Sequence, residues 1–305
     1  MRAIVPTAVA CVLVGGIACG PTPDRAGPAD LVSQARQLDL DGQQEAAAAL
    51  YEQVLDEDPD SYEAHYGLGR ALDLAGHYEQ ARVHFARAVE LTPESSRDQT
   101  LRMMGIAWTF AGRAEEAAPY FQEVFDRRLA ARNFPGASEV ANELGRVYLE
   151  TGDLDRAEQW YRRGHEIAGQ EADRPEWQVH LADIRWAHAL ARIAARRGDA
   201  DRARQHVGSV GALIEKGGND DQRVQYAYLR GYVAYHLQDY ESAVAHLAEA
   251  DQDDPFVLLL LAQAHEALGE AQTAQRYYTR VLASNSHAVN NAFARPVARA
   301  KVAAP

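Results

Sequence analysis

The chain has 305 residues, and its 44 aspartates and glutamates outnumber its 31 lysines and arginines, which gives a formal net charge of −13 at pH 7. Proteins that bind nucleic acids present a basic face to the phosphates, so this balance argues against a nucleic-acid partner. The only cysteines are Cys11 and Cys19, too few for a fold held together by a disulfide framework.

The first residues are predicted to be a lipoprotein signal peptide, residues 1–18. Arg2 is the only charge before Asp24, and it is followed by an apolar run that is too short to span a membrane comfortably. The run ends in Gly16-Ile17-Ala18-Cys19, which is similar to a bacterial lipobox, in which the cysteine is acylated and cleavage occurs just before it. We therefore predict that Cys19 is lipidated. The alternative is an ordinary signal peptide followed by an unmodified cysteine.

This resemblance implies a location in the bacterial cell envelope. Each buried methylene of an acyl chain contributes about 0.8 kcal/mol, so several chains on Cys19 would anchor the protein stably to a membrane. Gly20, where lipoproteins kept at the inner membrane carry Asp, favours the outer membrane, with the chain facing the periplasm. Residues 19–28 are rich in proline and glycine and are predicted to be a flexible tether.

An internal repeat then extends over residues 29–286. Seven turn residues set its frame: Gly42, Gly76, Gly112, Gly152, Gly198, Gln238 and Gly269. Five residues after each comes an alanine: Ala47, Ala81, Ala117, Ala157, Ala203, Ala243 and Ala274. Seven residues before each stands a small residue, and nine residues after each stands a larger apolar one, such as Gly69 and Phe85. Two helices that meet at a tight turn can approach closely only where side chains are small, and a bulky side chain fills the gap beyond.

The pattern resembles the tetratricopeptide repeat (TPR) family, which has a small residue in the first helix, a turn glycine, and an alanine and an aromatic residue in the second helix. The second repeat matches best, with Gly69, Gly76, Ala81, Phe85 and a closing Pro93. The resemblance implies an all-α fold, a right-handed solenoid of about seven antiparallel helix pairs in a TPR-like superhelix.

Three segments depart from the regular frame. Gln238 replaces a turn glycine in the sixth repeat. The longest insert, around Pro175, is expected to lengthen a helix; the alternative is a flexure that divides the array. Residues 287–305 leave the frame and form either a C-terminal cap, with Phe293 on the last hairpin, or a docking tail.

Enzyme signatures are missing from the sequence. His265-Glu266 lacks the second histidine of a metalloprotease motif, and Gly217-Gly218 is not followed by the Lys-Ser or Lys-Thr of a phosphate-binding loop. We therefore predict that the chain is not an enzyme and uses no metal and no cofactor.

Arginines recur at inward-facing positions of the first helices. These predicted groove residues are Arg36, Arg70, Arg102, Arg146 and Arg192, with Arg185, His188 and Arg196 nearby. A basic stripe inside an acidic protein would attract a carboxylate-bearing partner. The alternative is that Asp39, Glu63, Asp73, Glu139 and Glu150 pair with these arginines and neutralise the stripe.

Three tyrosines of the sixth repeat, Tyr228, Tyr232 and Tyr235, share one helical face. Tyrosine combines large contact area with a polar tip, so we predict that these side chains contact the partner in the groove. The alternative is an aromatic stripe packed inside the protein.

These observations together predict a membrane-anchored scaffold whose concave TPR groove binds a protein or peptide segment, with envelope assembly as its setting. Proteins built from such repeats expose an extended concave surface that binds partners. The alternative function is a binding protein for an anionic polymer or a small ligand.

Overall fold

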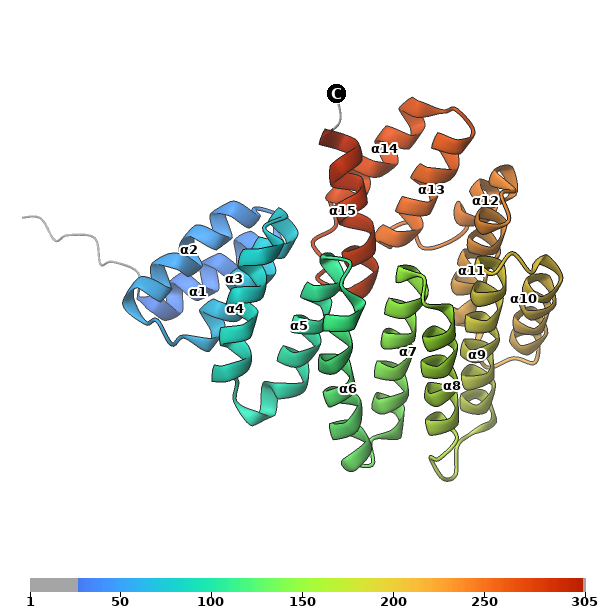
Figure 1. The fold of residues 1–305 in the computed structure, drawn as a ribbon, viewed down its shortest axis with the longest axis horizontal. Helices are drawn as coiled ribbons and strands as arrows, with labels where there is room; N and C mark the ends of the chain where they lie inside the picture. The colour runs from blue at the N-terminus through green and yellow to red at the C-terminus, as the bar shows by residue number, and fades with distance from the viewer. Residues whose placement is uncertain (1–26, 304–305) are drawn as a thin grey trace, which may run out of the picture.

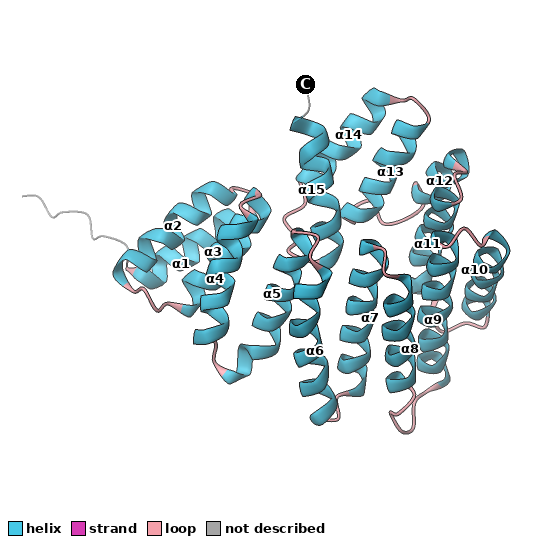
Figure 2. Cartoon of the chain, in the orientation of Figure 1, coloured by secondary structure: helices cyan, strands magenta, loops and turns pink. Residues whose placement is uncertain are grey.

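The computed structural model describes residues 27–303, and within them the chain forms helices and connecting loops with no strand (Figure 2). The predicted signal peptide, Cys19 and nearly all of the predicted tether lie outside this range. No helix between residues 27 and 303 combines the length and apolarity that a membrane crossing requires.

Seven antiparallel helix pairs stack side by side, and one further helix follows them (Figure 1). The pairs are α1 (Pro28–Leu40) with α2 (Gln44–Glu57), α3 (Tyr62–Ala75) with α4 (Tyr78–Leu91), α5 (Arg97–Phe110) with α6 (Ala114–Ala130), α7 (Phe134–Thr151) with α8 (Leu154–Ala168), α9 (Glu176–Arg196) with α10 (Ala200–Glu215), α11 (Arg223–His236) with α12 (Tyr240–Leu247), and α13 (Pro255–Ala267) with α14 (Ala271–Leu282). Short 3-10 turns, η1 (Glu94–Ser96) and η2 (Asp220–Gln222), precede α5 and α11. The predicted all-α solenoid of seven helix pairs is confirmed.

The turn inside each pair requires a left-handed backbone. The six predicted turn glycines have φ between 68° and 98°. Gln238 occupies the equivalent place in the sixth repeat with φ 65°, so a residue with a side chain adopts the conformation that glycine adopts elsewhere. Gln238 therefore replaces the turn glycine of the sixth repeat without changing the backbone conformation of the turn.

Small residues let the two helices of a pair touch. A Cβ atom on Gly69 would lie 2.9 Å from the Phe85 ring, and one on Gly105 would lie 2.7 Å from the Phe121 ring. Gly145 meets Tyr161 in the same way at 3.0 Å. These contacts confirm the small-against-large pairing that the repeat register predicts.

The insert around Pro175 is divided between a loop and a helix. The chain leaves helical structure over residues 169–175, and α9 then runs for 21 residues. The lengthened helix agrees with the expectation from the sequence.

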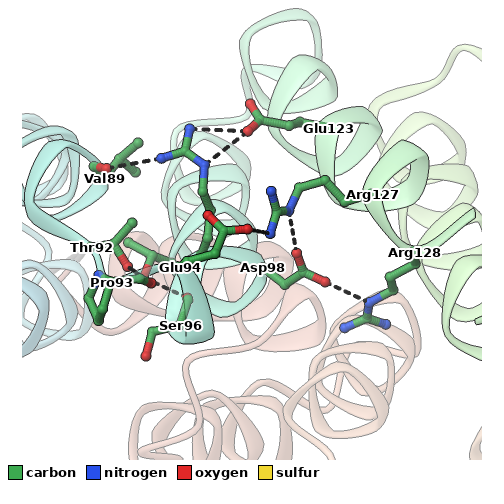
Figure 3. A network of polar contacts seen from close by, with 11 residues as sticks. Val89, Thr92, Pro93, Glu94, Ser96, Asp98, Glu123, Arg127 and Arg128 are labelled. Carbon is green, nitrogen blue, oxygen red and sulfur yellow. Dashed lines mark hydrogen bonds and ion pairs between the residues drawn. The ribbon is translucent and has the colours of Figure 1, made fainter. Parts of the chain in front are cut away.

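A polar network joins the two helices of the third pair near the start of α5 and the end of α6 (Figure 3). Arg127 of α6 donates to Asp98 of α5 at 2.7 Å and to Glu94 at 2.5 Å, while Arg97 donates to Glu123. Arg128 bonds to Asp98 at 3.4 Å, so one carboxylate serves two arginines.

The last helix, α15 (Val289–Ala303), lies against α14 and α13 and also against α5 and α7 (Figure 1). Val289 and Ala292 pack into the core of the first repeats, and Ala294 and Ala298 pack into the core of the last repeats. Phe293 contacts both cores and meets the Phe256 ring edge-on at 6.5 Å. The segment after the array is therefore a helix that connects its two ends.

Arg295 of α15 holds this connection together. Its side chain is 7% exposed, and it donates to the carbonyl oxygens of Leu74 (2.6 Å), Leu282 (2.7 Å) and Ser284 (2.9 Å). Leu74 and Leu282 lie in the last turns of α3 and α14, where helical carbonyls have no partner within their own helix. One guanidinium thus caps a helix of the second repeat and a helix of the seventh.

The loop before α15 is fixed to the first two repeats as well. Arg70 donates to the carbonyl oxygen of Asn285 at 2.9 Å, and the Asn285 amide donates to Leu40 O at 3.1 Å. His287 Nε2 lies 2.8 Å from a carboxylate oxygen of Asp73, and both side chains are almost fully buried. These contacts join residues more than 200 positions apart in the sequence.

Replacing Gln238 by glycine is expected to stabilise the protein. The left-handed conformation disfavours a residue with a Cβ by about 1–2 kcal/mol, and the greater freedom of an unfolded glycine offsets part of the gain. We expect Gln238→Gly to raise the free energy of unfolding by about 0.5–1 kcal/mol in chemical denaturation, and the converse change, Gly152→Gln, to lower it by a similar amount. Equal stabilities for Gln238→Gly and the parent chain would contradict this account of the turn.

Replacing Arg295 by methionine is expected to loosen the junction between the two ends. The variant loses three hydrogen bonds to carbonyls in a buried site, at a cost of about 2–4 kcal/mol. Hydrogen exchange should then accelerate in the α3–α4 turn, which is far from residue 295 in sequence. The matched control is Arg276→Met on the exposed face of α14, and the same change in both variants would argue against the junction.

Candidate functional site

One hollow of the described chain lies against the inner helices. We call this hollow the groove cavity; it has a volume of about 720 Å³ and is lined by α7, α9, Tyr161 of α8, the start of α11, the loop before α13 and the start of α15. Its lining includes Glu143, Arg146, Arg185, His188, Arg192 and Asp254. α7, α9 and α13 are the first helices of their pairs, the helices that the repeat pattern places on the concave side.

Arg192 is the most buried charged residue of this cavity. It is 5% exposed, and its guanidinium lies 5.3 Å from the ring centre of Tyr161. One terminal nitrogen, Nη2, donates to the Tyr161 hydroxyl at 3.0 Å. Within residues 27–303, Nε and Nη1 have no hydrogen-bond partner, and no carboxylate forms an ion pair with Arg192.

Arg146 lies beside Arg192 on the cavity, and its carboxylate partner is Glu150. Its Nε is 3.2 Å from Glu150 Oε1, and its guanidinium lies over the Phe256 ring at 4.5 Å. Glu150 also lies 3.2 Å from Arg196 Nη1. One buried carboxylate therefore faces two arginines.

Arg146 and Arg192 together form what we call the arginine wall, and their positive charges act on His188. The His188 ring stacks on Tyr228, with ring centres 5.7 Å apart. Burial, together with the positive charges of Arg192 and Arg146, holds the pKa of His188 well below its usual range. The imidazole is therefore neutral at pH 7, and its Nε2 has no partner among the described residues.

Three aspartates also line the groove cavity: Asp251, Asp253 and Asp254, which lie in the loop between α12 and α13. Asp254 caps α13 by accepting from Phe256 N at 2.7 Å, and it also accepts from the Asn290 amide at 2.6 Å. The cavity therefore carries both arginines and carboxylates on its surface.

A smaller pocket of about 160 Å³ adjoins the groove cavity between α7, α8 and α9. Its lining includes Trp177, Leu181 and Trp186, and three residues line both hollows: Asn142, Tyr161 and Arg185. Arg185 is exposed and lies at this junction. A bound segment can therefore contact an arginine wall and an aromatic pocket at the same time.

Only two of the five predicted groove arginines, Arg146 and Arg192, line the groove cavity. Arg70 lies 3.1 Å from Asp39 and binds the carbonyl of Asn285. Arg102 forms a two-pronged ion pair with Glu143, and Arg36 is exposed on α1. Arg70 with Asp39, and Arg146 with Glu150, show the alternative of arginines paired with carboxylates of the chain itself. Arg102 is paired too, but with Glu143, which was not among the carboxylates predicted from the sequence.

The predicted partner contacts of the tyrosines require correction. Tyr232 has no exposed surface and Tyr228 is 6% exposed, because both pack in the core against α9 and α13. Tyr235 is partly buried and packs edge-on against Tyr240. None of the three lines the groove cavity. They form the intramolecular aromatic stripe that was the alternative interpretation, and the two buried rings support the arginine wall from behind.

The aspartates of the cavity were not predicted from the sequence. Their signal is the run Asp251-Gln252-Asp253-Asp254 directly before the proline that begins α13, and only the fold places it on the cavity that α9 also lines. Among residues 27–303, no three histidines, cysteines or carboxylates gather as a metal site would require.

Four family models, each described as a tetratricopeptide repeat, match the chain at residues 40–102, 97–170, 185–209 and 257–287. A tetratricopeptide repeat protein from Parabacteroides merdae has a similar structure, with 13% identity, a TM-score of 0.52, and coverage of 90% of this chain and 97% of that chain. A Podosopora anserina protein with nearly identical TPR-like repeats reaches 19% identity and a TM-score of 0.50, with coverage of 64% and 100%. Among curated proteins, none matches the sequence.

At these identities the structural likeness concerns the fold alone. The four models extend from the first repeat to the seventh, and the helix pairs, turn residues and small-against-large contacts follow the same frame. The chain belongs to the tetratricopeptide repeat family.

Proposed function

We propose that the chain is a scaffold, anchored by a lipid to a bacterial membrane, that binds a segment of a protein partner in the groove cavity. The observation that carries this proposal is a cavity of about 720 Å³ lined by the inner helices α7, α9 and α11, by the loop that leads into α13 and by the start of α15. Solenoids of stacked repeats use this concave side as their binding surface, and repeats of this family generally act without catalysis. The proposal accordingly contains no reaction.

The fold restricts where the partner binds. α15 and the loop before it cover part of the inner side of the first three repeats, through contacts with α5 and with Asp73. The cavity lies beyond this covered part, and it continues into the aromatic pocket beside Trp177 and Trp186. We therefore assign the binding surface to the fourth to seventh repeats.

A small ligand is the second candidate, because the volume of the groove cavity falls within the range of about 300–1,000 Å³ that is usual for small-ligand sites. An anionic polymer fits less well, since the carboxylates of the α12–α13 loop would repel it.

The anchor and the location are part of the proposal. They are supported by the lipobox-like Gly16-Ile17-Ala18-Cys19 and by Gly20, which together favour the outer membrane and the periplasmic side.

Reversing the charge of Arg185 is expected to release the partner. Arg185 is exposed at the junction of the two hollows, so Arg185→Glu changes the binding surface without changing the core. In-cell crosslinking followed by purification should recover at least about tenfold less partner than from the parent chain.

The control for this experiment is Arg204→Glu on the outer helix α10, where the side chain is 69% exposed. A partner retained equally by both variants would place binding outside the groove cavity. Absence of any captured protein from the parent chain would favour the small ligand.

Replacing Cys19 by serine is expected to release the protein from membranes, because serine in this position cannot receive the thioether-linked lipid. Fractionation should move the protein from the membrane fraction to the soluble envelope fraction. Cys11→Ser, inside the predicted signal peptide, is the matched control and should stay membrane-bound. Membrane association of the Cys19→Ser variant would argue against the lipid anchor.

A further inference from the structure

At and near the groove cavity, arginines outnumber the carboxylates that pair with them. Glu150 pairs with both Arg146 and Arg196, whereas Arg192 has no carboxylate partner among the described residues. Arg192 is 5% exposed and is left with a single hydrogen bond to a tyrosine hydroxyl. A buried guanidinium without a counter-charge is unfavourable, and such charges in proteins are paired or bound to a ligand.

Other carboxylates near the cavity are engaged elsewhere in the described chain. Glu143 binds Arg102, and Glu139 lies 3.5 Å from Arg128. Asp254 caps α13 and accepts from Asn290. The chain itself therefore does not neutralise Arg192 in this arrangement.

We propose that the arginine wall of the groove cavity is a binding site for one carboxylate group, with Arg192 as its principal ligand and Arg146 and His188 beside it. The site rests on the proposed function, since it names the chemistry that the groove cavity recognises. Arg192 lines the groove cavity, and its Nε and Nη1 are buried without a hydrogen-bond partner among the described residues. A carboxylate bound in the cavity would supply the counter-charge that this guanidinium lacks.

The surroundings select a single carboxylate on an apolar body. Phe256 lies against Arg146, and Tyr161 lies against Arg192, so aromatic faces border both guanidinium groups. Asp251 and Asp253 also line the cavity and disfavour a ligand with several negative charges. The carboxylate belongs either to an acidic residue of a bound segment or to a free small acid.

Two pairs of probes separate these sources. N-acetylphenylalanine and its primary amide differ only in the carboxylate of a free small acid. An acetylated, amidated Phe-Glu dipeptide and its Phe-Gln counterpart differ only in a side-chain carboxylate within a segment. Calorimetric titration of the folded chain with each probe measures the contribution of the carboxylate directly.

We expect at least one acid to bind about tenfold more tightly than its amide, and this preference to fall to near unity in Arg192→Gln. Arg197→Gln, at the end of the same helix, is the matched control; Arg197 already pairs with Asp155 and Glu158 and should not affect the preference. A preference for the first acid alone identifies a small-molecule site, and a preference for the dipeptide identifies a site for a partner segment.

Equal binding of acid and amide by the parent chain would overturn the proposal, and this result does not depend on whether Arg192→Gln folds. A preference for the acid that persists in Arg192→Gln would overturn it as well. The scaffold is tested separately by Arg185→Glu. Partner capture that depends on Arg185, combined with equal binding of acid and amide, would leave the scaffold standing and refute only the carboxylate site.

Discussion

The contact between a small residue in the first helix of each pair and a bulky residue in the second determines the rest of the molecule. Where Phe85, Phe121 and Tyr161 lie against glycines, the two helices approach to the limit set by their backbones. A fixed approach within each pair gives a fixed orientation between pairs. This orientation places α7 and α9 on one cavity, which Arg146 and Arg192 both line. Packing contacts between apolar residues therefore determine where the charged side chains of the cavity lie.

The C-terminal helix adds a feature that simple repeat arrays lack. In a solenoid each repeat contacts only its neighbours, and stability is close to a sum over repeats and their interfaces. Here, Arg295 and His287 connect the seventh repeat to the second. The stability of the first repeats thus depends on residues at the other end of the chain. The same helix covers the inner side near α5 and leaves the cavity as the accessible part of the concave face.

Sequence reasoning predicted the fold and only part of the site. The register is local, since a turn glycine, an alanine and an aromatic residue recur at fixed spacing, and this placed Gln238 correctly in a turn. The pairing of Arg70 with Asp39, and the burial of Tyr232, depend on contacts between repeats and with α15. One sequence carries little information about such contacts. Inward-facing positions predicted Arg192 as a groove residue, but its lack of a counter-charge follows only from the three-dimensional arrangement of Glu150.

The position of α15 also has a consequence for the order of folding. Most contacts of a repeat array are local and form as the chain is synthesised, whereas the bond from Arg295 to Leu74 closes a loop of 221 positions. The first repeats therefore leave the ribosome with the capping site at Leu74 empty and part of the inner side of α5 uncovered. Both stay exposed until the last residues have emerged. A chain that ends before residue 289 contains every repeat and still lacks the contact that closes the array.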